Sequence, residues 1–181
     1  MRLCLRPSED WPGLLAEAPF AASHALHRTA VGWSGAWRST EALWPLPAQS
    51  VARIDLCFVL EHSDQPAALL AEAARVLCPE GRLLVLGLNP FAVGRWRWSR
   101  HGVRALPASR VARWLDAAGL IRLDERRLGP RWCPSAGLAT PAQGGPGRAV
   151  WALLAVRRES TPTPLRLPRA KWRVNPGIGL A

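Results

Sequence analysis

Two apolar runs of strand length, separated by one amphipathic stripe, constrain the fold of this chain more than any other feature. Residues 54–60 and residues 82–88 are almost continuously apolar. The stripe between them recurs at helical spacing and consists of Leu69, Leu70, Ala73, Val76 and Leu77. A strand without polar alternation is usually covered on both faces, as in a parallel sheet flanked by helices. The pattern therefore predicts a βαβ unit within an open α/β sheet.

Local signals set the limits of this unit. Ser63 and Asp64 suit the N-cap of the helix, and Pro66 suits its first turn. Pro79 should stop the helix, because the residue before a proline avoids the helical region. Gly81 can then take the positive φ of the turn into the second strand.

Weaker patterns flank the unit on both sides. Further strands are predicted at residues 2–6, 24–31, 120–126 and 150–156, the last being continuously apolar. A short helix is predicted over residues 14–22, and another follows the stripe of residues 111–118 and ends at Gly119. Residues 32–49 and the Gly- and Pro-rich residues 130–147 are predicted to be loops.

Length and composition are those of one ordinary globular domain. With 181 residues, of which 49% are hydrophobic and 20% charged, the chain can bury a proper core. We place the domain at residues 1–159, followed by an extended Pro- and Arg-rich tail at residues 160–181. No apolar stretch approaches the roughly 20 residues of a membrane span, and we find no signal peptide.

The four cysteines predict a reducing compartment and no metal centre. Cys4, Cys57, Cys78 and Cys133 form no CxxC pair. Two of them lie in apolar runs, where a thiol behaves as a small hydrophobe. We therefore expect reduced thiols and a cytoplasmic location. His24 and His27 stand three residues apart, but without further ligands they do not define a zinc site.

The net charge of +11 has two explanations. It can mark a nucleic-acid-binding surface. It can also reflect a compositional bias, because Lys171 is the only lysine, tyrosine is absent and Ala, Pro and Gly are abundant. We favour the compositional explanation.

Three segments in order, at residues 43–51, 58–66 and 71–83, together carry a resemblance to class I S-adenosylmethionine-dependent methyltransferases of the type 11 sort. Residues 43–51 (LWPLPAQSV) resemble the segment that precedes strand four in that family. Residues 58–66 (FVLEHSDQP) are similar to the stretch that ends this strand. Residues 71–83 (AEAARVLCPEGRL) resemble the family's helix and turn, with Glu80 where glycine is common. Asn89–Pro90 and the apolar strand at residues 150–156 suit a bacterial subgroup with the same pattern.

The resemblance implies a specific architecture. The fold would be a Rossmann-like open sheet of seven strands, mostly parallel with an antiparallel last strand and helices on both faces. Relative to the family it would be reduced at the N-terminus. S-adenosylmethionine would lie over the carboxyl ends of strands one to four, which agrees with the general rule for ligands in open α/β sheets.

The resemblance also implies a set of site residues. Arg6 would replace the family's glycine-rich loop and pair with the cofactor carboxylate. Phe58 would line the cofactor site, and Glu41 lies near the position whose acid binds the adenine amino group. His62, next to Glu61, is a weak candidate for a base, since histidine titrates near neutrality. It can equally serve as a solvated residue before the helix.

Departures from the family pattern leave two functions open. Residues 6–10 contain no glycine, and no acidic residue follows the second strand to accept the ribose hydroxyls. The chain is therefore either a methyltransferase-like enzyme with an unknown acceptor or a catalytically inactive relic that acts as a binding or partner protein.

A third hypothesis rests on residues 95–101, where arginine and tryptophan alternate. Such a segment can bind RNA by charge and stacking, or shape a substrate pocket, or fold onto the domain. We favour a small-molecule methyl acceptor over a nucleic acid.

Overall fold

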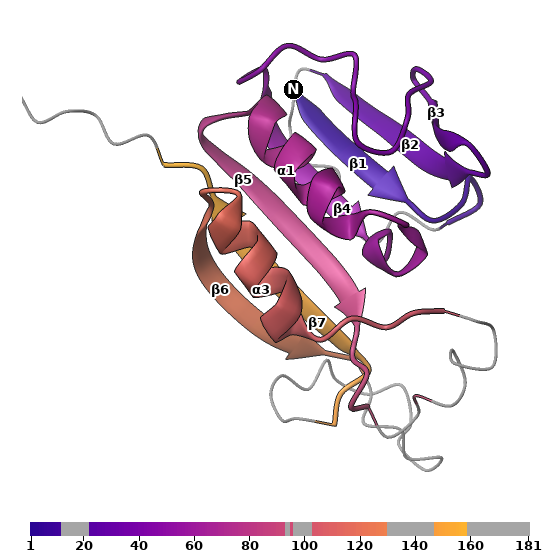
Figure 1. Cartoon of the computed structure of the whole chain (residues 1–181), viewed down its shortest axis with the longest axis vertical. Coiled ribbons are helices and arrows are strands. Elements are labelled where there is room, and N and C mark those ends of the chain that lie inside the picture. Colours follow the sequence, from indigo (N-terminus) through magenta and orange to yellow (C-terminus); the bar gives the residue numbers. More distant parts are fainter. Residues whose placement is uncertain (12–21, 93–94, 96–102, 130–146, 159–181) are drawn as a thin grey trace, which may run out of the picture.

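The computed structural model describes residues 1–11, 22–92, 95, 103–129 and 147–158. The predicted helix at residues 14–22, the loop at 130–147 and the tail at 160–181 lie wholly or almost wholly outside these residues. Seven strands form one open sheet in the order β3-β2-β1-β4-β5-β7-β6 (Figure 1). The strands are β1 (Arg2–Arg6), β2 (Ser23–Thr29), β3 (Gly32–Gly35), β4 (Val51–Cys57), β5 (Leu77–Leu88), β6 (Ile121–Leu128) and β7 (Val150–Val156).

Strand direction follows the sequence prediction closely. β1 pairs in parallel with both β2 and β4, and β4 pairs in parallel with β5. β7 is antiparallel to its neighbours β5 and β6, so the last strand is reversed as expected. The predicted mostly parallel open sheet is confirmed. β3 is an addition that the sequence did not indicate, since it turns back tightly on β2 within the segment predicted to be a loop.

The helix of the βαβ unit, α1 (Pro66–Val76), joins β4 to β5 after a short 3-10 turn, η1 (Leu60–His62). Its predicted apolar stripe is completely buried. The predicted caps were wrong: Gln65 is the N-cap residue and makes no side-chain capping bond. Pro66 occupies the first helical position as expected, where an N–H would have no partner within the helix. The helix ends at Val76, three residues before Pro79.

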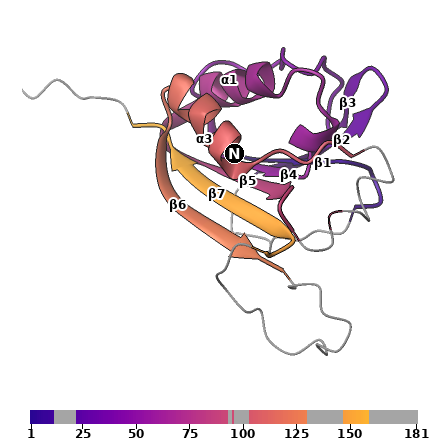
Figure 2. The same ribbon diagram turned by 60° about the horizontal axis from the view of Figure 1, so that its bottom comes forward.

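The second described helix, α3 (Ala108–Ala117), follows β5 and packs beside α1. Both helices cover the same face of the sheet (Figures 1 and 2). That face holds the main core, in which Leu3, Ile54, Leu83 and Leu153 come from four neighbouring strands and are fully buried. The opposite face carries a smaller cluster around Cys57, Leu86 and Ala152.

The family-like segments hold one another together. The buried Glu72 of α1 accepts a hydrogen bond from the Trp44 backbone N–H at 2.7 Å and pairs with Arg75 at 2.8 Å. Arg75 also donates to the Leu46 carbonyl oxygen at 2.9 Å. The pKa of Glu72 is lowered, first by Arg75 and then by the Trp44 amide. The loop before β4 is therefore fastened to the helix after it, although the two are distant in sequence.

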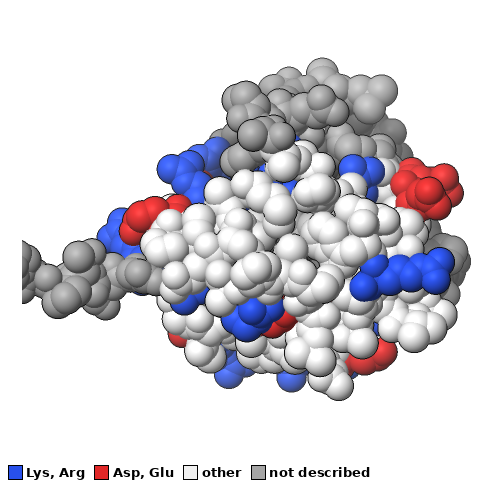
Figure 3. Space-filling model, turned by 90° about the horizontal axis from the view of Figure 1, so that it is seen from above, with Lys and Arg blue, Asp and Glu red and all other residues white. Residues whose placement is uncertain are grey.

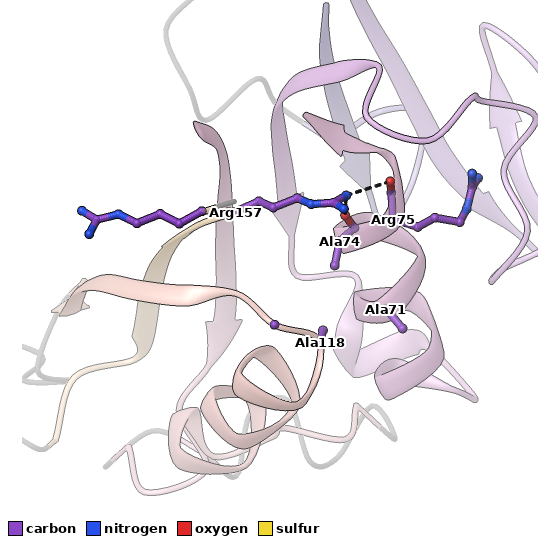
Figure 4. A pocket seen from close by; sticks show the side chains of 7 residues that line it. Ala71, Ala74, Arg75, Ala118 and Arg157 are labelled. Atoms are coloured by element: carbon purple, nitrogen blue, oxygen red, sulfur yellow. Dashed lines mark hydrogen bonds between the residues drawn. The ribbon is translucent and has the colours of Figure 1, made fainter. Parts of the chain in front are cut away.

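Arg157, the residue that follows β7, holds the other end of α1. One Nη of Arg157 donates to the carbonyl oxygens of Ala74, Arg75 and Leu77 at 2.8–3.1 Å. These carbonyls have no partner within the helix, and a cation there also suits the helix dipole. Figure 4 shows this guanidinium reaching the helix end beside a hollow of about 580 Å³ between α1 and α3.

The turn between α1 and β5 departs from expectation. Gly81 does not take the positive φ; Glu80 does, with φ of 58°. Gly81 is required for space instead, because a Cβ there would lie 2.7 Å from the Cys78 carbonyl oxygen and 2.8 Å from Leu77 Cγ. The glycine that the family places at the equivalent of Glu80 therefore relieves a backbone strain that this chain retains.

Replacing Glu80 with glycine should stabilise the protein. A residue with a side chain in the left-handed region costs about 1–2 kcal/mol, and the greater freedom of glycine in the unfolded chain offsets part of the gain. We expect Glu80→Gly to raise the free energy of unfolding by about 0.5–1 kcal/mol in urea titration. Glu80→Ala, which also removes the carboxylate, should give no such gain. A Gly variant no more stable than the Ala variant would contradict the assigned strain.

Replacing Gly87 with alanine should be strongly destabilising. A Cβ at Gly87 would lie 2.1 Å from an atom of the fully buried Trp151 ring. This indole donates to the carbonyl oxygens of Leu88 and Leu106 at 3.0 and 2.8 Å, so it cannot move aside freely. We expect Gly87→Ala to cost about 3 kcal/mol or more in urea titration. Combining it with Trp151→Leu should cost less than the sum of the two single changes, because the clash is then gone.

Candidate cofactor site at the carboxyl edge of the sheet

The parallel strands β1, β2, β4 and β5 end at one edge of the sheet. Arg6, Thr29, Cys57 and Leu88 close these strands, so the segments that follow them meet there. In open α/β sheets ligands bind in the crevice at this edge. The four residues proposed from the sequence, namely Arg6, Glu41, Phe58 and His62, can now be placed relative to it.

Arg6 lies at the end of β1 and lines a cavity of about 350 Å³ together with Ser8, Glu9 and His27. Its Nη1 donates to the Trp11 carbonyl oxygen at 3.4 Å. Its Nε is buried and has no hydrogen-bond partner. A buried donor without a partner is costly, so this guanidinium retains capacity for an anionic group.

Phe58 follows β4 with φ of 55°, a conformation unusual for a bulky residue. Its backbone N–H donates to the Leu86 carbonyl oxygen at 2.9 Å, which holds the turn to β5. Its ring contacts that of Trp11, with centroids 5.5 Å apart. Strain of this kind concentrates at ligand sites, and here it directs an aromatic ring toward the loop after β1.

Phe58 also borders an apolar groove on the sheet face opposite the helices. The groove has a volume of about 590 Å³ and is lined mainly by aliphatic side chains of β5, β6 and β7. Its two charged residues, Asp124 and Arg126, pair with each other at 2.6 Å. The groove therefore offers an apolar surface without net charge.

Glu41 is already engaged by the protein. Its carboxylate pairs with Arg28 of β2 at 2.5 Å, and its backbone carbonyl oxygen accepts the indole N–H groups of Trp33 and Trp44 at 3.2 and 3.3 Å. Arg28 stands one residue from the end of β2, the strand end where the family carries a ribose-binding acid. It also lies 3.5 Å from Asp64. Sequence reasoning did not single out Arg28, because only the fold brings it to Glu41.

Glu61 is the site residue whose importance the sequence underestimated. It lies in η1, is 5% exposed, and accepts a hydrogen bond from the Leu88 backbone N–H at 2.5 Å through Oε1. Its Oε2 is buried without a partner. Burial raises the pKa of Glu61 to about 7, against smaller lowering effects of backbone hydrogen bonds. The pair Glu61–His62 is visible in the sequence, but the burial of one member is not.

His62, the neighbouring candidate base, is exposed. Its pKa is lowered, first by partial desolvation and then by the charge of Arg28. It is therefore neutral at neutral pH and can accept a proton. The segment at residues 95–101 lies outside the described residues except for Arg95.

Charged side chains do not gather into a continuous basic stripe on the face shown in Figure 3, where Lys and Arg stand apart and acidic residues lie among them. No group of three or more His, Cys, Asp or Glu side chains that could hold a metal ion occurs in the described part of the chain. Among those same residues, no helix has the length and apolar character to cross a membrane.

The strand order and the reversed β7 define the class of fold. The fold is that of class I S-adenosylmethionine-dependent methyltransferases, as the sequence motifs indicated. Residues 22–85, which run from β2 into β5, match the model of the methyltransferase domain family. No curated protein sequence matches the chain.

Solved structures support the same fold at low sequence identity. A SAM-dependent methyltransferase from Thermotoga maritima is 16% identical with a TM-score of 0.56, over 66% of this chain and 62% of that one. The cyclase SpnF is 21% identical with a TM-score of 0.51, over 66% and 54%. Geranyl diphosphate C-methyltransferase from Streptomyces coelicolor is 15% identical with a TM-score of 0.50, over 66% and 52%. This chain thus spans little more than half the length of these structures.

The pKa of Glu61 predicts how stability depends on pH. A carboxyl whose pKa rises from 4.5 to about 7 on folding holds its proton in the native state while the unfolded chain has lost it. The contribution of Glu61 to the free energy of unfolding is therefore fully present below pH 4.5 and is lost as the pH rises through 7. We expect the stability of the wild type relative to Glu61→Gln to fall by on the order of 3 kcal/mol between pH 4.5 and 8.

The measurement is urea unfolding of both proteins across this pH range. Glutamine still accepts from the Leu88 amide but does not titrate, so the difference between the two proteins isolates Glu61 from the histidines. Parallel stability profiles would show that Glu61 titrates normally in the folded protein.

Proposed function

We propose that this protein binds S-adenosylmethionine at the carboxyl edge of β1, β2 and β4 and transfers its methyl group to a small-molecule acceptor. The observation that carries the proposal is the convergence of Arg6, Phe58 and Glu61 at the edge where this fold takes its ligands. Fold alone does not define function, so these side chains carry the argument.

The residues present fit the cofactor at one end and not at the other. Arg6, with its buried unpartnered Nε, suits the methionine carboxylate, and Phe58 suits an apolar part of the cofactor. The ribose hydroxyls would meet Arg28 near the end of β2 rather than a carboxylate. Oε1 of Glu41 is already paired with Arg28, which leaves one carboxylate oxygen for an adenine amino group. We therefore assign no residues of this chain to contacts with the ribose or the adenine.

Bound S-adenosylmethionine would supply an electrophilic methyl group on its sulfonium sulfur, and transfer depends mainly on the alignment of a nucleophile with that methyl. An acceptor that carries a proton must lose it. Glu61 can hold such a proton near neutral pH at its unpartnered Oε2. His62, exposed and neutral, is the second candidate for this role.

The apolar groove beside Phe58 favours an acceptor with an apolar body. Ligand pockets of a few hundred Å³ lined by aliphatic and aromatic side chains are typical of small-molecule sites. The Streptomyces coelicolor relative was solved with geranyl diphosphate, which has such a body. A small apolar acceptor therefore agrees better with the described surface than a nucleic acid does.

A catalytically inactive binding or partner protein is the alternative. It is favoured by the Arg28–Glu41 ion pair, which occupies the only carboxylate that we had placed near the adenine, and by the absence of glycine from residues 6–10. SpnF, which has a similar fold, is described as a cyclase and not as a methyltransferase.

Cell location and domain limits remain proposals of the same kind. Cys4, Cys57 and Cys78 are free thiols, which supports a cytoplasmic setting. We retain residues 1–159 as the methyltransferase-like domain and residues 160–181 as a tail.

Calorimetric titration with S-adenosylmethionine and S-adenosylhomocysteine tests the proposal. We expect a Kd below about 100 µM, which corresponds to about −5.5 kcal/mol. Arg6→Ala should weaken binding by about tenfold or more, because it removes a charge-assisted hydrogen bond to the cofactor carboxylate. Arg122→Ala, which removes an equal charge from β6 outside the groove, should bind like the wild type. Absence of binding at millimolar cofactor would overturn the proposal of an enzyme and favour the inactive binding or partner protein.

A further inference from the structure

Strands β1 and β4 place six polar or thiol side chains on one face of the sheet, the face opposite α1 and α3. They alternate with the buried Leu3, Leu5, Ile54 and Leu56, which point to the main core. In the parallel register Arg2 lies beside Arg53 and Cys4 beside Asp55. The six residues are Arg2, Cys4 and Arg6 on β1 and Arg53, Asp55 and Cys57 on β4.

Cations outnumber anions in this ladder. Asp55 is completely buried and pairs with Arg2 at 2.7 Å and with Arg53 at 2.9 Å. One carboxylate thus serves two guanidinium groups. Arg6 faces Cys4 from the same strand, and its buried Nε has no partner. A further negative charge beside Arg6 would therefore be stabilised, and Cys4 is the group placed to provide it.

Cys57 completes the environment of Cys4. The Cys57 thiol donates a hydrogen bond to Cys4, which lowers the pKa of Cys4 to about 6 as the largest effect, and Arg6 lowers it further. Burial, the second-largest effect, raises the pKa of Cys4, and the charge of Asp55 raises it by the smallest amount. The same hydrogen bond raises the pKa of Cys57. On β2, His27 is the titratable residue that faces the same side beside Arg6.

The two thiols differ in access as well as in charge. Cys57 is 3% exposed, whereas Cys4 is only partly buried. A thiolate that is both stabilised and reachable is the form of cysteine that reacts as a nucleophile.

We propose that Cys4 is a nucleophilic thiol that forms covalent adducts with small uncharged electrophiles, with Arg6 and Cys57 stabilising its thiolate. This site shares Arg6 with the proposed cofactor site, but its test is carried out without cofactor, so the two proposals can fail separately.

Iodoacetamide is the probe. The Cys4 sulfur attacks the methylene carbon, an S–C bond forms, the C–I bond breaks and iodide leaves with the electron pair. The product is a thioether, and no oxidant or reductant is required. The full-length protein would be alkylated without cofactor from pH 5 to 9, and the rate at each cysteine read by peptide mass spectrometry.

The rate of alkylation at Cys4 should rise with pH, with a midpoint near pH 6. At pH 6 it should exceed that of glutathione by about tenfold, because half of Cys4 is thiolate while an ordinary thiol of pKa about 8.5 is less than 1% ionised, and the lower basicity offsets only part of this. A midpoint at pH 8 or above in the wild type would overturn the proposal without any variant.

Variants separate the two stabilising groups. Arg6→Gln and Cys57→Ala should each move the midpoint upward by about one pH unit or more, while Cys57→Ser, which keeps a donor, should move it less. Cys78→Ser removes a thiol of β5 outside the ladder and should leave the Cys4 profile unchanged. If Arg6→Gln retains the wild-type circular dichroism spectrum and the wild-type midpoint, Arg6 does not stabilise the thiolate and the proposal fails.

Discussion

The parallel pairing of β4 with β5 under α1 is the constraint on which the rest of the structure depends. The pairing brings Ile54 and Leu56 beside Leu83 and Val85, and all four are buried on the helix-covered face. Burial of this apolar area is the main favourable contribution to folding. It also puts the segment after β4 at the edge where Arg6 ends β1. Without this pairing, Glu61 and Phe58 would not lie at a common edge with Arg6.

Hydrogen bonds from charged side chains then hold the neighbouring loops against these strands and α1. Glu72 and Arg75 hold the loop before β4, and Arg157 donates to backbone carbonyl oxygens at the end of α1. Each is a hydrogen bond between segments that the chain separates widely. The family-like motif at residues 71–83 is therefore explained in part by architecture, since Glu72 and Arg75 serve the fold. This is consistent with a fold that is better preserved than the cofactor contacts.

The carboxyl edge combines retained and altered features. Arg6 and Glu61 each present a buried polar atom without a partner, which a folded protein rarely tolerates without a use. In contrast, the Arg28–Glu41 pair satisfies both of its members and fills the region near the end of β2. The methionine end of a cofactor and a proton-holding group are therefore easier to accommodate than the ribose. On the face of β1 and β4 opposite the helices, the thiols of Cys4 and Cys57 lie in the same ladder as Arg6.

The sequence by itself determined the elements whose signal is local: the apolar runs of β4, β5 and β7, the stripe of α1, the end of α3 at Gly119, and through the motifs the class of fold. It did not indicate β3, whose four residues lack an apolar pattern. It also did not indicate the strain at Glu80, because the local pattern assigned the positive φ to Gly81. Only the tertiary structure decided which charges meet. Arg28 pairs with Glu41, Asp55 lies between two arginines, and Glu61 is buried away from water. Hydrogen bonding and desolvation depend on neighbours that the fold brings together from distant positions in the sequence.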